Sequence, residues 1–415
     1  MKREKPEVAL LTYSTFIILG CTFLASINFF NRYYYFLFLA SFFFFITPYK
    51  RINFNSSFLI LILFSLFILF FNPAFQTKFT SMLKPFVYPL CYLMGSSMYL
   101  NASKNDLQTA ENNVKKIIYV LSGGLFTHYL LNMFVNLNAT NRNAIDFWSK
   151  ETMSATSQAS LAALMVGVAA ALLFSEVHWT KRIIAVVSFI VMVWYNLILA
   201  GRTLFALIAI LMIFAVIHRS IVTKQKIFKT LLIGFLIVLV FICIYNINLF
   251  GLKTYLENTN LFKRFFENGI SKSFILDTRI NYKFLYLKHF FKYPFGGNKI
   301  KDLAGGKYAH DLYFDTYSES GIFAFIAIVI YIVLSLVRMV KCMRSKQISF
   351  ETRQLIACIY IVVNIQFWLE PIITGMPWLL VSYAFIDGAV TYLLSMENKQ
   401  TTKRSLRQTP RGETL

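Results

Sequence analysis

The stretch that decides the fold is Ile183-Ile-Ala-Val-Val-Ser-Phe-Ile-Val-Met-Val-Trp-Tyr-Asn-Leu-Ile-Leu-Ala200, which contains no charged residue. A helix needs roughly 20 such residues to cross the hydrocarbon core of a bilayer, and Thr230–Asn246 has the same character. Overall, 57% of the residues are hydrophobic and only 14% are charged. A soluble protein would have to bury about a dozen such segments in one core. The sequence therefore predicts an all-α polytopic membrane protein.

About twelve transmembrane helices can be drawn along the chain, and Pro85 and Pro89 predict a kinked start for the fourth. The predicted spans are 8–30, 33–47, 57–72, 86–101, 116–136, 156–175, 183–200, 203–218, 230–249, 320–338, 355–374 and 376–395.

The basic residues predict the orientation of these helices. Lys181/Arg182 and the cluster from Arg219 to Lys229 lie on the side shared with the N-terminus, whereas the short loops on the other side hold few cations. The positive-inside rule then places the N-terminus in the cytoplasm, and an even number of spans places the C-terminus there too. The net charge of +22 thus reflects topology and contact with anionic membrane lipids, and no nucleic acid is expected as a partner.

The predicted domains are nine spans in residues 1–249, a large extracytoplasmic loop at 250–319, three spans at 320–395, and a basic cytoplasmic tail at 396–415 that is expected to be disordered. The first apolar run lacks a cleavage pattern, so it is expected to remain as a helix. The five cysteines lie in or beside apolar segments, without metal-ligand spacing. Neither a P-loop nor a nucleotide fingerprint occurs, so neither a metal nor another cofactor is expected.

Arg202 stands almost without a loop between two apolar segments, in Leu199-Ala-Gly-Arg-Thr-Leu-Phe205. An arginine near hydrocarbon is costly unless something anionic or aqueous faces it. Two interpretations are open: its side chain extends to the outer headgroups, or it faces a cavity and binds phosphate through its bidentate fork.

The large loop contains a predicted amphipathic helix that begins near Asp277 and Thr278, both plausible N-cap residues. Apolar residues recur at positions 280, 284, 287 and 291, which is helical spacing. The helix is expected to end before the turn Tyr293-Pro-Phe-Gly-Gly297. Either its basic face meets headgroups or it faces substrate. Its other face is predicted to hold Arg279, Lys283, Tyr286 and His289 or Phe290.

His310 lies just before the tenth predicted span, and histidine exchanges a proton near neutral pH. If 310–319 begins that helix, His310, Phe314 and Tyr317 share one face. The role is either structural or that of a base tuned by its surroundings. The neighbouring candidates for contact with substrate are Asp311, Tyr313, Asp315 and Glu319.

Two further polar residues fall within predicted spans. His128 and Asp387 are functional candidates by position, although each is equally explained by a hydrogen bond between helices. His178 and His218 lie at the cytoplasmic ends and are predicted to be surface residues.

Four short motifs in order resemble the O-antigen polymerase and O-antigen ligase superfamily of bacterial inner membranes. The resemblance covers residues 150–340, and the family usually has Asn where this chain has Asp311. The motifs are Ala200-Gly-Arg-Thr-Leu204, Asp277-Thr-Arg-x5-Leu-Tyr-Leu287, Pro294-Phe-Gly-Gly297 and Ala309-His-Asp-Leu-Tyr-Phe-Asp-x3-Glu-Ser-Gly-Ile322.

The resemblance implies a metal-independent glycosyltransferase of the GT-C type, whose donor is a glycan on undecaprenyl diphosphate. It implies that Arg202 and Arg279 hold the diphosphate and that His310 is the base for the acceptor hydroxyl. Two guanidinium groups would neutralise the leaving group. A polymerase, which joins lipid-linked repeat units and has a polysaccharide chain-length regulator as a candidate partner, is favoured over a ligase that transfers glycan to lipid A-core. A flippase or other transporter is disfavoured because no internal repeat is visible.

Overall fold

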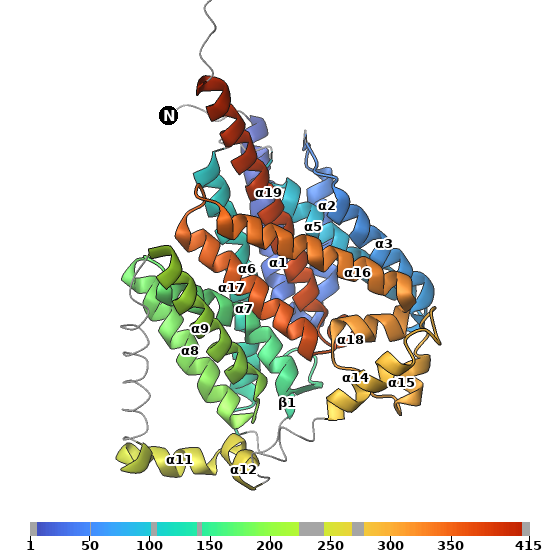
Figure 1. Ribbon diagram of the computed structural model, residues 1–415, viewed down its shortest axis with the longest axis vertical. Helices are drawn as coiled ribbons and strands as arrows, with labels where there is room; N and C mark the ends of the chain where they lie inside the picture. Colours follow the sequence, from blue (N-terminus) through green and yellow to red (C-terminus); the bar gives the residue numbers. More distant parts are fainter. Residues whose placement is uncertain are drawn as a thin grey trace, which may run out of the picture.

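The computed structural model describes residues 6–49, 51–100, 106–138, 143–223, 245–267 and 278–408. This part of the chain is a bundle of helices with one short β-hairpin (Figure 1). The first half contains α1 (Pro6–Ser26), η1 (Phe29–Asn31), α2 (Tyr33–Ile46), α3 (Ser56–Phe71), η2 (Pro73–Phe75), α4 (Phe79–Leu83), η3 (Lys84–Phe86), α5 (Val87–Ser97), α6 (Leu107–Val135), β1 (Asn143–Ile145), β2 (Thr152–Ser154), α7 (Ala155–Phe174), α8 (Trp179–Ile198) and α9 (Thr203–Thr223). The second half contains η4 (Leu249–Gly251), α11 (Leu252–Asn258), α12 (Asn260–Glu267), α14 (Thr278–Lys288), α15 (Lys299–Leu303), α16 (Leu312–Arg344), α17 (Phe350–Leu369), α18 (Ile372–Gly375) and α19 (Pro377–Gln408).

Seven helices in the described residues are long and apolar enough to cross a membrane: α6, α7, α8, α9, α16, α17 and α19. The shorter apolar helices are Leu10–Ser26, Tyr33–Ile46 and Ser56–Phe71. The expectation of an α-helical membrane protein is confirmed at this level. The predicted ninth span, 230–249, lies mostly outside the described residues.

Three predicted boundaries differ from the structure. The fourth predicted span forms only the eleven-residue α5, which at 1.5 Å per residue is about half a bilayer long, because η3 precedes it with Pro85. The tenth begins at Leu312, since Asp311 caps it, and continues to Arg344. The prediction that the tail from residue 396 is disordered is wrong as far as Gln408, because α19 continues to that residue.

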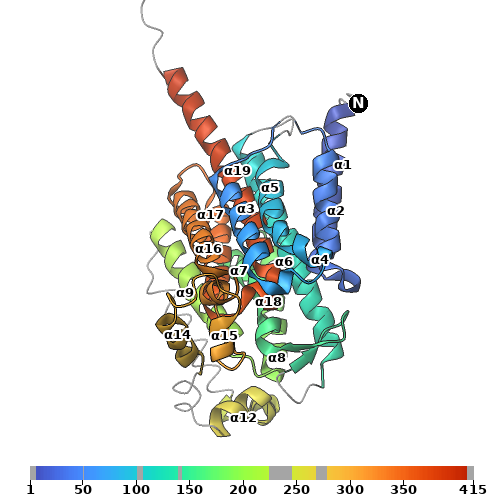
Figure 2. The same cartoon turned by 90° about the vertical axis from the view of Figure 1, so that its right-hand side faces the viewer.

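The two ends of the bundle differ in what they carry. The beginning of α1 and the end of α19 lie at one end, which we call the terminal end (Figures 1 and 2). The antiparallel strands β1 and β2, with Ala144 opposite Met153, lie at the other end together with α11, α12, α14 and α15. We call this the hairpin end, and the polar sites described below lie there.

Small residues set the packing of the inner helices. The sequence of α7 is rich in Ala and Gly, and the helix lies between α6, α8, α9 and α17. The α5 and α19 backbones touch at Gly95 and Gly388, where an added Cβ would lie 2.1 Å from the Phe385 carbonyl oxygen and 2.2 Å from that of Tyr92. Such close approach is typical of helix pairs in membranes, where packing rather than the hydrophobic effect drives association.

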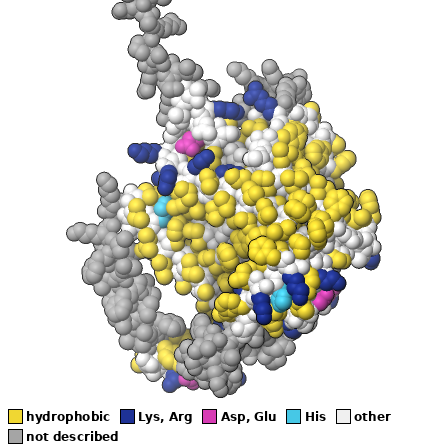
Figure 3. Space-filling model, turned by 45° about the vertical axis from the view of Figure 1, so that its right-hand side comes forward, with side chains coloured by type: hydrophobic (Ala, Val, Ile, Leu, Met, Phe, Trp, Pro, Cys, Tyr) yellow, Lys and Arg dark blue, Asp and Glu magenta, His cyan; other side chains and the backbone are white. Residues whose placement is uncertain are grey.

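The outer surface between the two ends is apolar. A broad hydrophobic face lies between polar regions rich in Lys and Arg (Figure 3). Large apolar side chains such as Ile190 on α8 and Ile213 on α9 are about 60% exposed. A water-soluble protein rarely leaves so large an apolar face uncovered, whereas lipid chains solvate it well.

Candidate functional site

The first polar site at the hairpin end is formed by α14, α15 and the first turns of α16. A turn at Pro294–Gly297 packs on α16, where the Ile322 amide donates to the Pro294 carbonyl at 2.8 Å. The helix is kinked there because Gly321 has φ 81° and ψ −178°. A Cβ on Gly321 would lie 2.6 Å from the Pro294 carbonyl oxygen, and one on Gly296 would lie 2.5 Å from the Gly321 nitrogen. Only glycine satisfies both the backbone conformation and this contact.

His310 lies in a strained turn immediately before α16. Its φ of 58° is uncommon for a residue with a side chain. The Asp315 carboxylate holds the turn, because it accepts hydrogen bonds from the Ala309 amide at 2.8 Å and from the Asp311 amide at 3.2 Å. His310 therefore precedes the helix rather than beginning it, and the expectation that it shares a helical face with Phe314 and Tyr317 is wrong. Backbone strain maintained by its surroundings is found most often at functional sites.

Asp311 connects this turn to α14. One carboxylate oxygen caps α16 by accepting from the Phe314 amide at 2.7 Å, and the other lies 3.2 Å from the Lys283 ammonium. Lys283 also donates to the Trp368 carbonyl at 2.7 Å. Burial raises the pKa of the Asp311 carboxyl above its ordinary value, against the opposing effects of the Phe314 amide and Lys283. An Asn at this position would lack the negative charge that pairs with Lys283.

Aromatic packing fixes α14 on the rest of the site. Tyr286 is fully buried, and its hydroxyl donates to the Lys307 carbonyl at 2.9 Å. Phe290 stacks on Tyr317 with ring centroids 4.0 Å apart. Tyr313 packs on Trp368 at 4.7 Å. The predicted helix is confirmed, and its apolar positions 280, 284, 287 and 291 are all exposed.

Glu319 lies deeper in the same cluster. It is buried, accepts a hydrogen bond from the Asn72 side-chain amide at 3.0 Å, and is paired with Thr374 of α18. Buried carboxyl groups of this kind need such partners because an unpaired one is costly. Glu319 thus links α16 to the end of α3 and to α18.

The two arginines occupy different elements of the hairpin end. Arg202 is partly buried in the turn between α8 and α9, where the Asn196 side chain bonds the Gly201 carbonyl. Asn260, at the start of α12, donates to the Ile198 carbonyl at 2.8 Å, so α12 lies beside this turn. Arg279 is in the first turn of α14, and its side chain lies outside the described residues.

The structure thus brings together most of the predicted site. Lys283, Asp311 and Asp315 form one contact network that holds the backbone on both sides of His310. Tyr286 joins the same segment through the Lys307 carbonyl. Tyr313 and Glu319 lie at its edges. Arg202 lies in a different element, the turn between α8 and α9.

A second polar site is a cavity of about 670 Å³ bounded by α1, α2, η3, α6, the β-hairpin, α7 and the α18–α19 turn. Arg202 and His310 do not line it. The lining includes two basic side chains, Arg32 and Lys84, and two acidic ones, Asp146 and Glu151. The remaining lining includes Tyr33, Tyr34, Tyr35, Trp378 and the hydroxyls of Ser26, Thr80, Ser149, Thr152, Ser154 and Ser157.

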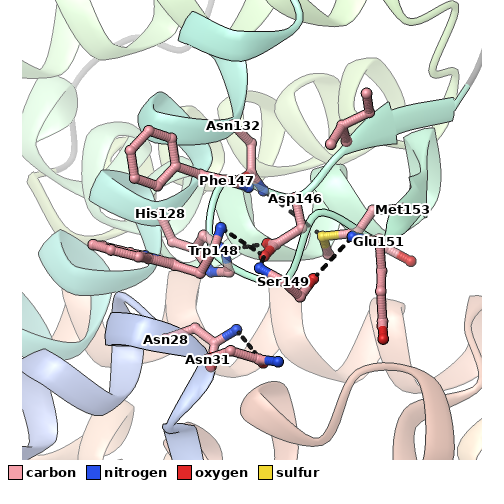
Figure 4. A network of polar contacts seen from close by, with 12 residues as sticks. Asn28, Asn31, His128, Asn132, Asp146, Phe147, Trp148, Ser149, Glu151 and Met153 are labelled. Carbon is pink, nitrogen blue, oxygen red and sulfur yellow. Dashed lines mark hydrogen bonds and ion pairs between the residues drawn. The ribbon is translucent and has the colours of Figure 1, made fainter.

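The inner wall of the cavity holds a buried histidine–aspartate pair (Figure 4). His128 Nε2 lies 2.5 Å from Asp146 Oδ2, and the two residues are 3% and 2% exposed. The other oxygen of Asp146 accepts from the amides of Trp148 and Ser149 at 3.0 and 2.7 Å. Burial alone would raise the pKa of this carboxyl, but the hydrogen bond and charge of His128, with the Ser149 bonds, lower it well below its ordinary value. Asp146 therefore stays ionised.

Sequence reasoning named His128 but missed its partner. The other charged residues of the cavity were missed too, because they lie in short connections between helices. The periodicity of the flanking helices does not predict how such connections fold. These residues are Asp146, Glu151, Arg32 and Lys84. One local signal was present, an aspartate in a short polar connection. Its carboxylate accepts hydrogen bonds from the amides two and three residues later, as in an Asx-type turn.

The other polar residues named from the sequence are structural. Asp387 accepts from Arg338 and from the Tyr360 hydroxyl at 2.7 Å, which fits the interpretation of a bond between helices. His178 is exposed at the start of α8, as predicted. The prediction of a surface position is wrong for His218, which is buried between the rings of Phe214 and Phe350.

Neither a scan against protein-family models nor a search of curated proteins found a match for this chain. The site is therefore interpreted from its own geometry and chemistry.

Proposed function

We propose that the protein is a metal-independent glycosyltransferase of a bacterial inner membrane that joins undecaprenyl-diphosphate-linked repeat units of a surface polysaccharide, an O-antigen polymerase. The observation that carries the proposal is the contact between two separate sequence motifs. Lys283 and Tyr286 of α14 bind Asp311 and the segment that leads to His310. The residues that resemble the family's motifs are thus neighbours, around a histidine in a strained backbone conformation.

The proposed topology has twelve spans, with both termini in the cytoplasm and the hairpin end in the periplasm. The first and last helices begin and end at the same end of the bundle (Figure 1), as an even number of spans requires. The basic residues predict that end to be cytoplasmic. Lipid-linked glycan would then meet α14 at the outer membrane surface, and the exposed Ile280, Phe284 and Leu287 suit contact with lipid.

In the proposed reaction an acceptor sugar hydroxyl attacks the anomeric carbon of the donor. The new carbon–oxygen bond forms as the bond from that carbon to the diphosphate breaks, and lipid diphosphate leaves with the bonding electron pair. The imidazole of His310 takes the hydroxyl proton. Arg202 and Arg279 neutralise the charge that develops on the diphosphate. Asp315 positions His310 by fixing the amides on both sides of it.

The second candidate is an O-antigen ligase, in which the acceptor is lipid A-core. The same arginines and base serve both reactions. A transporter is disfavoured because the charged residues found within the bundle, such as Asp387 with Arg338, bind each other and do not line a path.

The test is His310→Ala in a strain deleted for the chromosomal gene, with His289→Ala, immediately after α14, as the matched control. We expect His310→Ala to abolish long-chain polysaccharide on gels while membrane insertion persists, and His289→Ala to retain the normal ladder. A core bearing one repeat unit indicates a polymerase, and bare core with glycan left on the lipid carrier indicates a ligase. A normal ladder from His310→Ala removes this residue from the mechanism.

Arg279→Ala is expected to have the same phenotype, because a diphosphate leaving group would lose a guanidinium. Arg202→Lys should also lose most activity, since a point charge does not replace a bidentate fork. Wild-type chain length in Arg202→Lys would favour a headgroup contact for that side chain.

A further inference from the structure

The cavity at the hairpin end carries two cations without an acidic partner in the part of the chain that the structure describes. The Arg32 guanidinium lies over the Tyr35 ring at 5.1 Å, and the Lys84 ammonium lies over the Tyr34 ring at 5.1 Å. Such contacts orient a cation but do not neutralise its charge. Arg32 is exposed and Lys84 partly so. Both cations are therefore accessible to an anion that enters from the hairpin end.

Other residues of the cavity lining suit polar groups rather than hydrocarbon. Asp146 is held ionised by His128 and two amides, and Glu151 is exposed at the rim. Carboxylates accept hydrogen bonds from hydroxyl groups, and the serines and threonines around them both donate and accept. Tyr34 and Trp378 add flat apolar surfaces of the kind that pack against the C–H face of a sugar ring. A ligand with many hydroxyls and an anionic group fits this combination.

The cavity also adjoins the proposed catalytic site. Gly375 and Pro377, which flank the end of α18, line the cavity. Thr374 of the same short helix pairs with Glu319 of α16, and α18 packs against α16. One four-residue helix thus separates the cavity from the cluster around His310. A substrate in the cavity would lie beside the place where glycosyl transfer is proposed.

We infer that this cavity is a second substrate site, which binds the acceptor glycan through an anionic group held by Arg32 and Lys84 and through sugar hydroxyls held by Glu151 and the serine and threonine hydroxyls of the lining. The inference rests on the proposed function, because a transferase must hold two glycans at once. Its volume of about 670 Å³ is within the usual range of small-molecule sites. The anion has two possible sources, the diphosphate of the acceptor's lipid carrier or an acidic sugar.

The experiment uses the full-length protein in detergent micelles and measures binding of three probes by calorimetry. The probes are a water-soluble short-chain polyprenyl diphosphate, a disaccharide that contains glucuronate, and the corresponding neutral disaccharide. We expect an anionic probe to bind and Lys84→Ala to weaken that binding at least tenfold. Lys84→Arg should retain it, and the matched control Lys78→Ala, which changes an exposed lysine just before α4, should leave it unchanged. The probe whose binding Lys84→Ala weakens identifies the source of the anion.

If the cavity takes the diphosphate of the lipid carrier, the polyprenyl diphosphate should bind twice, because the proposed catalytic site also takes a diphosphate. Arg279→Ala should remove one of the two binding events and Lys84→Ala the other. If Arg279→Ala reduces binding of the polyprenyl diphosphate and Lys84→Ala reduces binding of no probe, the cavity inference is overturned and the proposed function stands. If only Lys84→Ala reduces binding, the cavity site stands and the role of Arg279 in the proposed function fails. If Lys84→Ala and Lys78→Ala bind all probes equally, the inference is also overturned.

Discussion

Two charged regions of this protein use their charges differently. Inside the bundle, the Arg338 guanidinium donates to both oxygens of Asp387, and its third nitrogen donates to Ser57 at 2.8 Å. Tyr360 completes the network, so the charges join α3, α16, α17 and α19 and satisfy one another. At the hairpin end, His310 is held in a strained turn and the Arg32 and Lys84 cations face a cavity.

The difference separates structural charge from functional charge. A buried pair whose donors and acceptors are all used has nothing left to offer a substrate, although it specifies how helices meet. A cation that lies over an aromatic ring, without a carboxylate beside it, keeps its charge for another molecule. The comparison predicts that mutations in the first region change stability and mutations in the second change activity.

The largest effect on stability is expected for Asp387→Ala. The substitution leaves the Arg338 guanidinium buried without its carboxylate, and removal of one partner of a buried ion pair costs about 3–5 kcal/mol. The free energy of unfolding in mixed micelles, followed by circular dichroism, should fall by that amount. The double variant Arg338→Met/Asp387→Leu should recover much of the loss, because no charge then remains unpaired. A double variant no more stable than Asp387→Ala would show that the pair itself is required.

Gly321→Ala is expected to have a smaller effect on stability and a larger one on function. The new Cβ would meet the Pro294 carbonyl oxygen and the Phe295 backbone, and a φ of 81° with extended ψ costs about 1–3 kcal/mol for a residue with a side chain. The turn at Pro294–Gly297 should detach from α16 while the bundle remains folded. Limited proteolysis should cut within 290–310 in the variant, and polysaccharide chain length should shorten. The matched control is Gly305→Ala, whose Cβ would meet nothing within 4 Å although its φ is also positive.

The helices could be predicted from the sequence because a bilayer fixes both the length and the polarity of each segment. Ile183–Ala200 could hardly be anything other than a membrane helix. Which helices pack against each other could not be predicted from the sequence. For example, the contact of α5 with α19 at Gly95 and Gly388 joins segments almost 300 residues apart, and it leaves no periodic signal in either segment. The short α5 also shows that an apolar run does not give the length of the helix it forms.

The sequence predicted which residues form the candidate site but not how they are arranged. Lys283, Tyr286 and Asp311 were grouped correctly because helical spacing and sequence order already bring them to one end of the chain's large polar interval. The conformation of His310 depends on two hydrogen bonds that the amides of Ala309 and Asp311 donate to the Asp315 carboxylate. Hydrogen bonds from backbone amides to a side chain leave no recognisable pattern in the sequence. The His128–Asp146 pair was missed because the β-hairpin that presents Asp146 has only three residues in each strand.

The smallest effect on stability, and one that depends on pH, is expected for Lys283→Met at the hairpin end. Asp311 is fully buried, and its carboxyl pKa is raised above 3.8 by burial and lowered in part by Lys283. A carboxyl whose folded pKa exceeds its unfolded pKa binds more protons in the folded state, so stability falls as pH rises between the two values. Removal of the ammonium raises the folded pKa further and extends this loss toward neutral pH. Because Lys283 is partly exposed, the cost at pH 7 should be about 1 kcal/mol. Thermal unfolding of both proteins between pH 4 and 8 measures it, and a difference that does not change with pH would assign the role of Lys283 to its packing on Trp368.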